Sequence, residues 1–184
     1  MFQINTWKVR DTIKKNPYVS DVKINRKING TVEINITERI PKYLVKIGKN
    51  YIYIDVQGYI LETTSKNLEL PILKGLKTEV NSMIPGSRLV KEDLLKLDTV
   101  AQIMESAKAS RFESLITKID ITDEKAYKLV LEKGKKVAYL GDGAKIPQKM
   151  VWIAKILEEE KGIKGEIFVT NIEKSKVFFR ESLI

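Results

Sequence analysis

Apolar and polar residues alternate along this chain with two different periods. A period of two, which is typical of half-buried strands, recurs over residues 21–27, 31–38, 43–47, 51–54, 59–62, 115–122, 126–132, 136–140, 166–170 and 176–180. A helical period is clearest over residues 91–109, with an apolar stripe formed by Leu97, Val100, Ala101 and Met104. Two more helices are predicted, at residues 6–15 and 148–160, since Pro17 follows the first and Pro147 opens the second. Many strands combined with few helices predict an α+β fold.

A short turn determines how the first two strands pair. A two-residue Asn-Gly loop would mix apolar and polar residues on each face of the hairpin. A three-residue loop instead places Ile24 opposite Ile34 and Val22 opposite Ile36, so that the aliphatic side chains share one face. We therefore expect a bulged hairpin with Gly30 at positive φ. The same reasoning applied to the later turn at residues 55–58 predicts that Ile54 pairs with Ile60 and Tyr53 with Leu61.

Proline and glycine residues divide the chain. Pro41 interrupts the strand pattern, and we place the boundary between a first lobe, residues 1–40, and a larger domain, residues 41–184. Residues 67–87 contain two prolines and two glycines and are predicted to be irregular.

The composition excludes several kinds of active site. The 184 residues include no Cys and no His, which rules out cysteine or histidine zinc ligands, a thiol nucleophile and a Ser–His–Asp triad. The carboxylates that qualify by type for acid–base catalysis are Glu38, Asp120, Asp123 and Asp142, but they lie at turns or alternate outward on strands. Gly141-Asp142-Gly143 is only a fragment of a dinucleotide-binding motif, because the third glycine position holds Ile146. We predict no catalytic residue, no cofactor and no metal site.

The positive charge is concentrated near the start of the chain. Lys and Arg outnumber Asp and Glu by 33 to 24, and residues 1–50 hold 11 of the former against 4 of the latter. Nucleic acid is a poor candidate partner, because only 6 of the 33 basic residues are Arg and no aromatic residue lies within residues 20–40. Two interpretations remain: a solvated face, or weak contact with an anionic lipid or wall-polymer surface through Lys14, Lys15, Lys23 and Lys27.

Five short motifs occur in order along the chain, beginning with Asn16-Pro17-Tyr18-Val19 and Glu38-Arg39-Ile40-Pro41. The first resembles the helix-to-strand step of the POTRA domain of the FtsQ/DivIB cell-division proteins, and the second resembles the E-R-x-P that closes that domain. Residues 53–61 resemble the hairpin that follows, and residues 70–75 resemble the L-P-x-L-x-G segment. The remaining similarity lies in Leu140-Gly141, Lys149 and Ile156-Leu157. The similarity as a whole extends from about residue 2 to residue 169.

The resemblance implies a partial POTRA lobe at residues 1–40 and an FtsQ/DivIB β domain at residues 41–184, with an antiparallel sheet flanked by helices. Because the similarity begins partway into the POTRA domain, strand 21–27 is expected to be exposed or paired with a neighbouring chain. The chain would be the extracytoplasmic part of a single-pass membrane protein at the division septum. It would act as a non-enzymatic scaffold that binds FtsL-type and FtsB/DivIC-type partners and thereby influences septal peptidoglycan synthases. The alternative is a module that binds anionic wall polymer or lipid headgroups.

The last predicted strand, residues 176–180, is the predicted partner site. The last strand of a sheet built in chain order lies at an edge, and Val177-Phe178-Phe179 carries no charge, proline or glycine to prevent another strand from pairing. Because side chains alternate between the two faces of a strand, one of these two phenylalanines should face away from the core. The alternative is that helix 148–160 and a loop bury both rings. Arg180 is expected to pair with an acidic residue of the partner. The complete predicted site is Asn171, Ile172, Val177, Phe178, Phe179 and Arg180, and the family's partner is expected to dock near these C-terminal strands.

Overall fold

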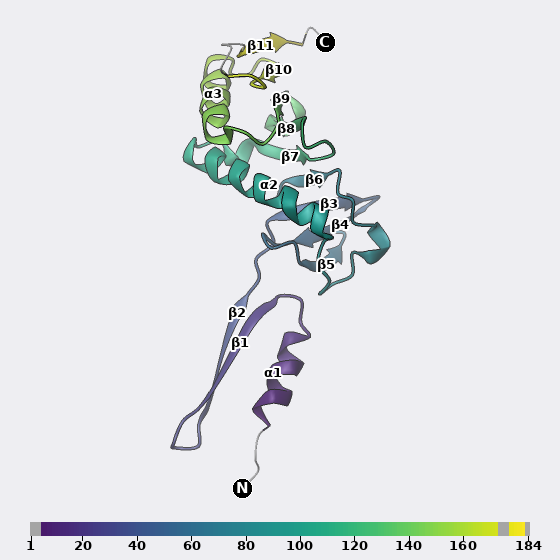
Figure 1. The fold of residues 1–184 in the computed structure, drawn as a ribbon, viewed down its shortest axis with the longest axis vertical. Coiled ribbons are helices and arrows are strands. Elements are labelled where there is room, and N and C mark those ends of the chain that lie inside the picture. The colour runs from purple at the N-terminus through teal and green to yellow at the C-terminus, as the bar shows by residue number, and fades with distance from the viewer. Residues whose placement is uncertain (1–4, 173–176, 183–184) are drawn as a thin grey trace.

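The computed structural model describes residues 5–172 and 177–182, which form an elongated molecule with a small first lobe at one end (Figure 1). That lobe contains helix α1 (Thr6–Lys14) and strands β1 (Val19–Arg26) and β2 (Val32–Glu38). Asn5 begins the helix, because its side chain accepts a hydrogen bond from the Lys8 amide at 3.1 Å. The two strands form a separate antiparallel sheet, and neither pairs with a further described strand. The predicted exposure of the β1 edge to strand pairing is therefore confirmed.

The first hairpin has the predicted register. Ile24 lies opposite Ile34 and Val22 opposite Ile36. The Gly30 amide donates to the Lys27 carbonyl at 3.0 Å, which closes a three-residue loop, and Gly30 has a φ of 84°. The alternation of aliphatic residues was thus a better guide to this turn than the Asn-Gly pair.

The larger domain is a nine-stranded sheet with two long helices. Its strands are β3 (Tyr43–Ile47), β4 (Asn50–Ile54), β5 (Ile60–Thr64), β6 (Ile72–Lys74), β7 (Ile116–Asp120), β8 (Tyr127–Leu131), β9 (Lys136–Gly141), β10 (Gly165–Phe168) and β11 (Phe178–Glu181). The helices are α2 (Lys91–Ala109) and α3 (Ile146–Glu159), with single turns η1 (Val80–Ser82), η2 (Glu113–Leu115) and η3 (Glu132–Gly134). The strand order is β11-β10-β9-β8-β7-β6-β3-β4-β5.

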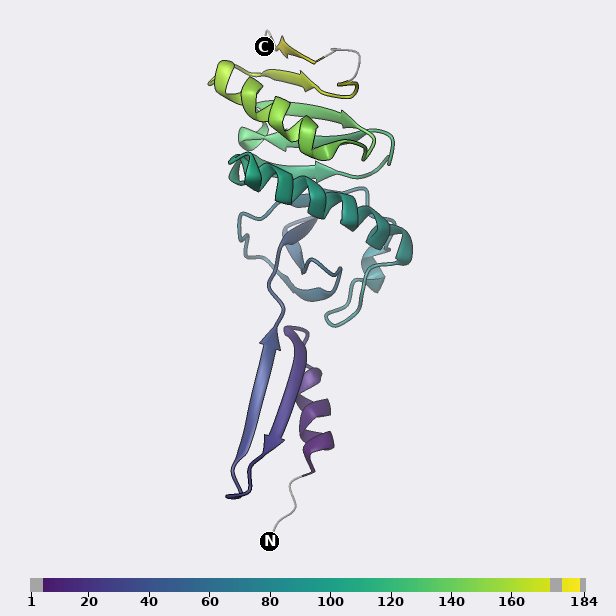
Figure 2. The same ribbon diagram turned by 60° about the vertical axis from the view of Figure 1, so that its left-hand side comes forward.

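The α+β class is confirmed, but the sheet is mixed rather than antiparallel. β6 pairs in parallel with both β3 and β7, and β9 pairs in parallel with β10. β6 lies within residues 67–87, which were predicted to be irregular, and it occupies the middle of the sheet between β3 and β7. Both long helices lie side by side on one face of the sheet (Figure 2). In the described part of the chain, the opposite face carries no long helix.

The second predicted hairpin register was only half right. Ile54 pairs with Ile60 as expected, but Tyr53 pairs with Glu62 and not with Leu61. A bulge in β5 causes this shift, since one extra residue stands opposite the Tyr53–Ile54 step. The bulge allows two consecutive residues to be buried: Ile60 joins the main core, whereas Leu61 joins a smaller cluster with Leu44 and Tyr53.

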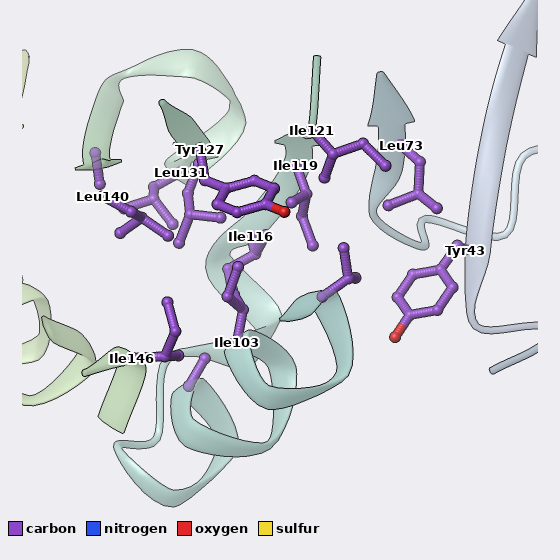
Figure 3. Close-up of a cluster of buried hydrophobic side chains, with 14 of the residues drawn as sticks. Tyr43, Leu73, Ile103, Ile116, Ile119, Ile121, Tyr127, Leu131, Leu140 and Ile146 are labelled. Carbon is purple, nitrogen blue, oxygen red and sulfur yellow. The ribbon is translucent and has the colours of Figure 1, made fainter. Parts of the chain in front are cut away.

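The main core lies between the two long helices and the sheet. Figure 3 shows Ile103 of α2 pointing toward Ile116, Ile119 and Tyr127 of the sheet. The buried face of α2 differs from the predicted stripe, because Leu97 and Val100 are buried whereas Ala101 and Met104 are half-buried at its margin. The polar members of this face are Asp93 and Lys96, and both have hydrogen-bond partners. The Lys96 ammonium donates to the Ile121 carbonyl at 2.9 Å, and Asp93 accepts from the loop before the helix.

Arg39 connects the two lobes. Its guanidinium donates to the Asp55 carboxylate at 2.7 Å and to the Gln57 side chain at 2.8 Å, and it stacks 3.6 Å from the centre of the Tyr59 ring. The Arg39 amide donates to the Tyr18 carbonyl at 2.7 Å, while the Tyr18 side chain packs against the smaller cluster. Burial and the neighbouring Glu62 carboxylate raise the pKa of Tyr18 to about 12. The E-R-x-P motif therefore has a structural role at this junction.

Candidate partner-binding edge

Strand β11 forms one end of the nine-stranded sheet, as the sequence predicted. It pairs antiparallel with β10, with Phe178 opposite Phe168 and Glu181 opposite Gly165. On its other side no described strand pairs with it. β11 lies at the end of the molecule opposite the first lobe (Figure 2). Position 176 of the predicted strand lies outside the described residues.

The two phenylalanines of β11 point to opposite faces. Phe179 is half-buried and packs against the main core together with Val177 and Ile172. Phe178 is 50% exposed. The alternative in which helix 148–160 and a loop bury both rings is therefore wrong. Phe179 also fits closely over Gly165, where any side chain would overlap its ring.

An aromatic row crosses the helix-free face of the sheet and ends at Phe178. The rings of Tyr139 and Phe168 stack with their centroids 4.8 Å apart, and those of Phe168 and Phe178 are 4.6 Å apart. The Lys128 ammonium lies 5.3 Å from the centre of the Tyr139 ring. These residues come from the four consecutive strands β8 to β11. Sequence reasoning missed Tyr139 and Phe168, although both stand at outward positions of their strands, next to buried Leu140 and Ile167.

A charged row lies beside the aromatic one. The Glu166 carboxylate accepts from the Tyr139 hydroxyl at 2.7 Å and from Nε of Arg180 at 2.9 Å, and it also pairs with Nη2 of Arg180. The hydrogen bonds from Tyr139 and Arg180 lower the pKa of Glu166, while the bond to Glu166 raises the pKa of Tyr139. Arg180 thus has a partner within its own chain. Its side chain is still 64% exposed, so a second carboxylate can approach it.

On the helix side, β11 borders a small hollow. It measures about 230 Å³ and is lined by Trp152, Lys155, Ile156, Glu159, Glu160 and residues 177–179. Trp152 is 40% exposed. Because strand side chains alternate between faces, a strand added to β11 would present one set of side chains to this hollow and the other set to the aromatic row.

The other predicted site residues lie farther from the free edge or apart from one another. Asn171 is half-buried at the end of the described segment before β11. Lys14, Lys15, Lys23 and Lys27 are all exposed. However, α1 and β1 run in opposite directions (Figure 1), so the lysines that end α1 and the lysine that follows β1 lie at opposite ends of the lobe. Lys14 and Lys27 each form an ion pair with a neighbouring acid, with N–O distances of 3.7 Å and 3.3 Å.

Two of the candidate carboxylates, Asp120 and Asp142, are engaged in local contacts. Asp120 accepts from Thr122 at 2.6 Å and pairs with Lys74, and Asp142 pairs with Lys149 at 3.2 Å. Within the described residues, no group of acidic side chains is placed to hold a metal ion. Nor does any described helix have the length and apolar composition required to cross a membrane.

Comparison with known proteins matches two sequence families. The model described as POTRA domain, FtsQ-type, matches residues 1–39, and that described as cell division protein FtsQ/DivIB, C-terminal, matches residues 43–172. The cell division protein DivIB of Clostridium tetani is 26% identical over 170 residues, which cover 90% of this chain and 62% of that protein. The cell division protein FtsQ of Geotalea daltonii is 30% identical over 100 residues, which cover 53% of this chain and 36% of that protein.

A solved structure gives a further similarity. The major extracytoplasmic domain of the trans isomer of DivIB from Geobacillus stearothermophilus covers 70% of this chain and 99% of that chain, at 12% identity and a TM-score of 0.41. The present chain spans less than two thirds of the length of either sequence relative. The C-terminal family model alone covers well over half of the chain, and the POTRA model precedes it in order. The chain therefore belongs to the FtsQ/DivIB family of cell-division proteins.

Proposed function

We propose that this chain is the extracytoplasmic part of a bacterial membrane protein at the division septum. It acts there as a non-enzymatic scaffold. It binds FtsL-type and FtsB/DivIC-type bitopic partners and, through them, influences the septal peptidoglycan synthases. Membership of a family of non-enzymatic cell-division proteins supports the general role. The particular partners follow from the motif resemblance described above.

The partner attaches by adding a strand to β11. The single observation that carries this proposal is the combination of an unpaired β11 edge with a half-exposed Phe178. An unpaired edge offers backbone N–H and C=O groups to an extended segment. Alternate side chains of that segment then cover the Phe178 ring on one face and reach the Trp152 hollow on the other.

The exposed half of the Phe178 ring sets the expected size of the effect. A phenylalanine buries about 200 Å² when fully covered, so covering the remaining half removes about 100 Å² from water. At about 25 cal/mol per Å² this amounts to about 2.5 kcal/mol. Loss of this contact should weaken binding by about 50-fold or more.

The test compares two neighbouring substitutions, Phe178→Lys and Phe179→Lys, with Leu95→Lys as a control. Leu95 is an exposed apolar residue of α2, on the other face of the sheet. Binding to a DivIC-type extracytoplasmic domain is measured by calorimetry, and folding by thermal melting. Phe178→Lys should weaken binding at an unchanged melting temperature, Phe179→Lys should unfold the domain, and Leu95→Lys should change neither. A folded Phe178→Lys protein with unchanged affinity would place the site elsewhere.

A second candidate function is contact of the first lobe with an anionic surface. The observation that favours it is the charge of residues 1–50, together with Lys15 and Lys23, which are exposed and pair with no described residue. Charge reversal at Lys23 and Lys27 should reduce binding to anionic liposomes at low salt. Equal binding by the variant and the parent protein would remove this candidate.

A further inference from the structure

The first lobe ends, on the side away from the larger domain, in two short segments (Figure 1 and Figure 2). One is the first turn of α1, and the other is the turn that joins β1 to β2. They lie at the same end because α1 and β1 run in opposite directions, so that the helix begins where the strand ends. We call residues 5–10 and 25–33 the lobe tip.

Two apolar side chains project from the lobe tip into solvent. Ile28 is fully exposed and Trp7 is 73% exposed, which makes them the two most exposed large apolar residues in the described part of the chain. Ile28 stands in the three-residue loop that is closed by the hydrogen bond from the Gly30 amide to the Lys27 carbonyl. Trp7 lies in the first turn of α1, and its side chain leans toward the same end, because the Cα–Cβ bonds of a helix tilt toward its beginning. Contacts within the described lobe therefore bury neither side chain.

The lobe tip also carries most of the excess positive charge of the first lobe. It holds four basic residues, Lys8, Arg10, Arg26 and Lys27, against one acid, Glu33, which gives a formal charge of +3. The ion pair of Glu33 with Lys27, at 3.3 Å, leaves both side chains about half exposed. The rest of the lobe, residues 11–24 and 34–40, holds four basic residues against three acids, a formal charge of +1. Exposed apolar groups and positive charge thus coincide at one end.

We propose that the lobe tip docks on an anionic lipid surface, with Trp7 and Ile28 inserted at the level of the headgroups. This inference rests on the second candidate function above and adds which part of the lobe makes the contact and which kind of surface it meets. Tryptophan is enriched at membrane–water interfaces, and a basic surface with apolar groups beside it binds anionic lipid through both terms. A wall polymer offers negative charge but no apolar layer, so it would leave both side chains in water.

The shape of the lobe determines how it meets such a surface. The eight residues of β1 extend for about 26 Å, whereas the nine residues of α1 rise about 14 Å. The hairpin therefore reaches farther than the helix, and a flat surface that meets both lies at a slant to the strands. The lobe then stands between the lipid and the larger domain, whose β11 edge lies at the opposite end of the molecule (Figure 2). It acts as a spacer that holds this edge away from the lipid.

The two tryptophans of the chain allow each end to be observed separately. Trp7 belongs to the lobe tip, whereas Trp152 belongs to α3 of the larger domain. In a Trp152→Phe variant, vesicles of phosphatidylcholine and phosphatidylglycerol in equal parts should shift the emission of Trp7 to shorter wavelength. Vesicles of phosphatidylcholine alone should bind more weakly, and salt should weaken binding to the anionic vesicles. In a Trp7→Phe variant, the emission of Trp152 should not change. An unchanged Trp7 emission, or a shift of Trp152 in its place, would overturn the proposal.

A matched pair of substitutions measures the apolar part of the contact. Ile28→Asn changes the fully exposed residue of the lobe tip, and Ile84→Asn makes the same change at an exposed site of the larger domain. In vesicle sedimentation, Ile28→Asn should weaken binding about tenfold, the size expected when one isoleucine no longer leaves water. Ile84→Asn should bind like the parent chain, and both variants should keep its melting temperature. Equal binding by Ile28→Asn and the parent chain would contradict insertion of the tip.

The outcomes separate this inference from the candidate function on which it rests. If the chain binds anionic vesicles but the Trp7 emission and Ile28→Asn show no effect, contact through charge holds and insertion of the tip is wrong. If the chain does not bind anionic vesicles at all, both are wrong. Equally tight binding to soluble poly(glycerol phosphate), without a shift of Trp7, would assign the lobe tip to a wall polymer. A Trp7 shift that appears when the chain alone is concentrated would assign it to a second copy, and either result would overturn the proposal.

Discussion

Gly75, the last residue of the L-P-x-L-x-G segment, allows the chain to leave the central strand β6 past Thr122. It has a φ of 93°, in the left-handed region. A Cβ atom at this position would overlap the backbone N and Cα atoms of Thr122. Thr122 cannot easily retreat, because its amide and hydroxyl both donate to Asp120, at 3.0 Å and 2.6 Å. Gly75→Ala should therefore destabilise the domain strongly.

The predicted loss of stability has two parts, and the same substitution at a second glycine distinguishes them. Gly134 has a nearly identical φ of 96°, but a Cβ atom there would meet nothing within 4 Å. Gly134→Ala should thus cost only the left-handed strain, about 1–2 kcal/mol. Gly75→Ala adds an overlap with backbone that costs about 1–3 kcal/mol more, for a total near 4 kcal/mol.

Urea unfolding and thermal unfolding, both followed by circular dichroism, measure the two variants against the parent protein. For a chain of this size, about 4 kcal/mol corresponds to a fall of about 12 °C in melting temperature, against about 4 °C for the control. Equal losses at the two glycines would refute the reasoning, because they would leave strain as the only cost. A Gly75→Ala protein that is as stable as the parent would show that the Thr122 backbone yields freely.

Three further predictions concern polar contacts. Glu166→Gln should reduce the free energy of unfolding more at pH 7 than at pH 3: a carboxyl whose pKa is lowered by folding stabilises the protein above its unfolded pKa of about 4.5 and loses this effect as the pH falls through the folded value. Urea titrations at the two pH values test this, and an equal deficit at both would contradict it. Asp93→Ala should cost about 3 kcal/mol or more, because it removes the acceptor of two backbone amides and of the buried Thr78 hydroxyl; a calorimetric loss below about 1 kcal/mol would contradict the assignment. Arg39→Lys keeps the charge but loses the planar fork and the ring stacking, so spin-label distances between the lobes should broaden while the larger domain melts as before.

The alternation of side chains predicted more of this structure than any single motif. The register of Ile24 with Ile34 followed from requiring all aliphatic side chains on one face, and the bounds of helix α2 followed from its apolar period. Strand β6 could not be found this way, because its three residues between Pro71 and Gly75 are too few to show a period. Its position comes from pairing with β3 and β7, which are distant in sequence.

The same limit applies to the candidate site. The sequence indicated that one of two adjacent phenylalanines faces outward, but not which one. The choice depends on the register between β10 and β11, which places Phe178 beside Phe168 on the helix-free face. Tyr139 and Glu166 of the charged row were missed for a similar reason. They lie on β9 and β10 and become neighbours only when these two strands pair in parallel.

The two edges of the large sheet are treated differently, and this contrast supports a binding role for one of them. At the far edge, the chain covers the beginning of β5: the Ile60 amide donates to the Ser87 carbonyl at 2.9 Å, and the Gly86 amide donates to the Ile60 carbonyl at 2.8 Å. Arg88 continues this cover through a bridge to Tyr59. An unpaired edge invites aggregation, and proteins normally blunt it. At β11 no described segment provides such a cover, and the exposed side chains are those of Phe178, Arg180 and Glu181. Among the described residues, a loop pairs with the beginning of one edge strand, whereas the other edge strand stays unpaired beside stacked aromatic rings, and this contrast supports the proposal that a partner strand binds at β11.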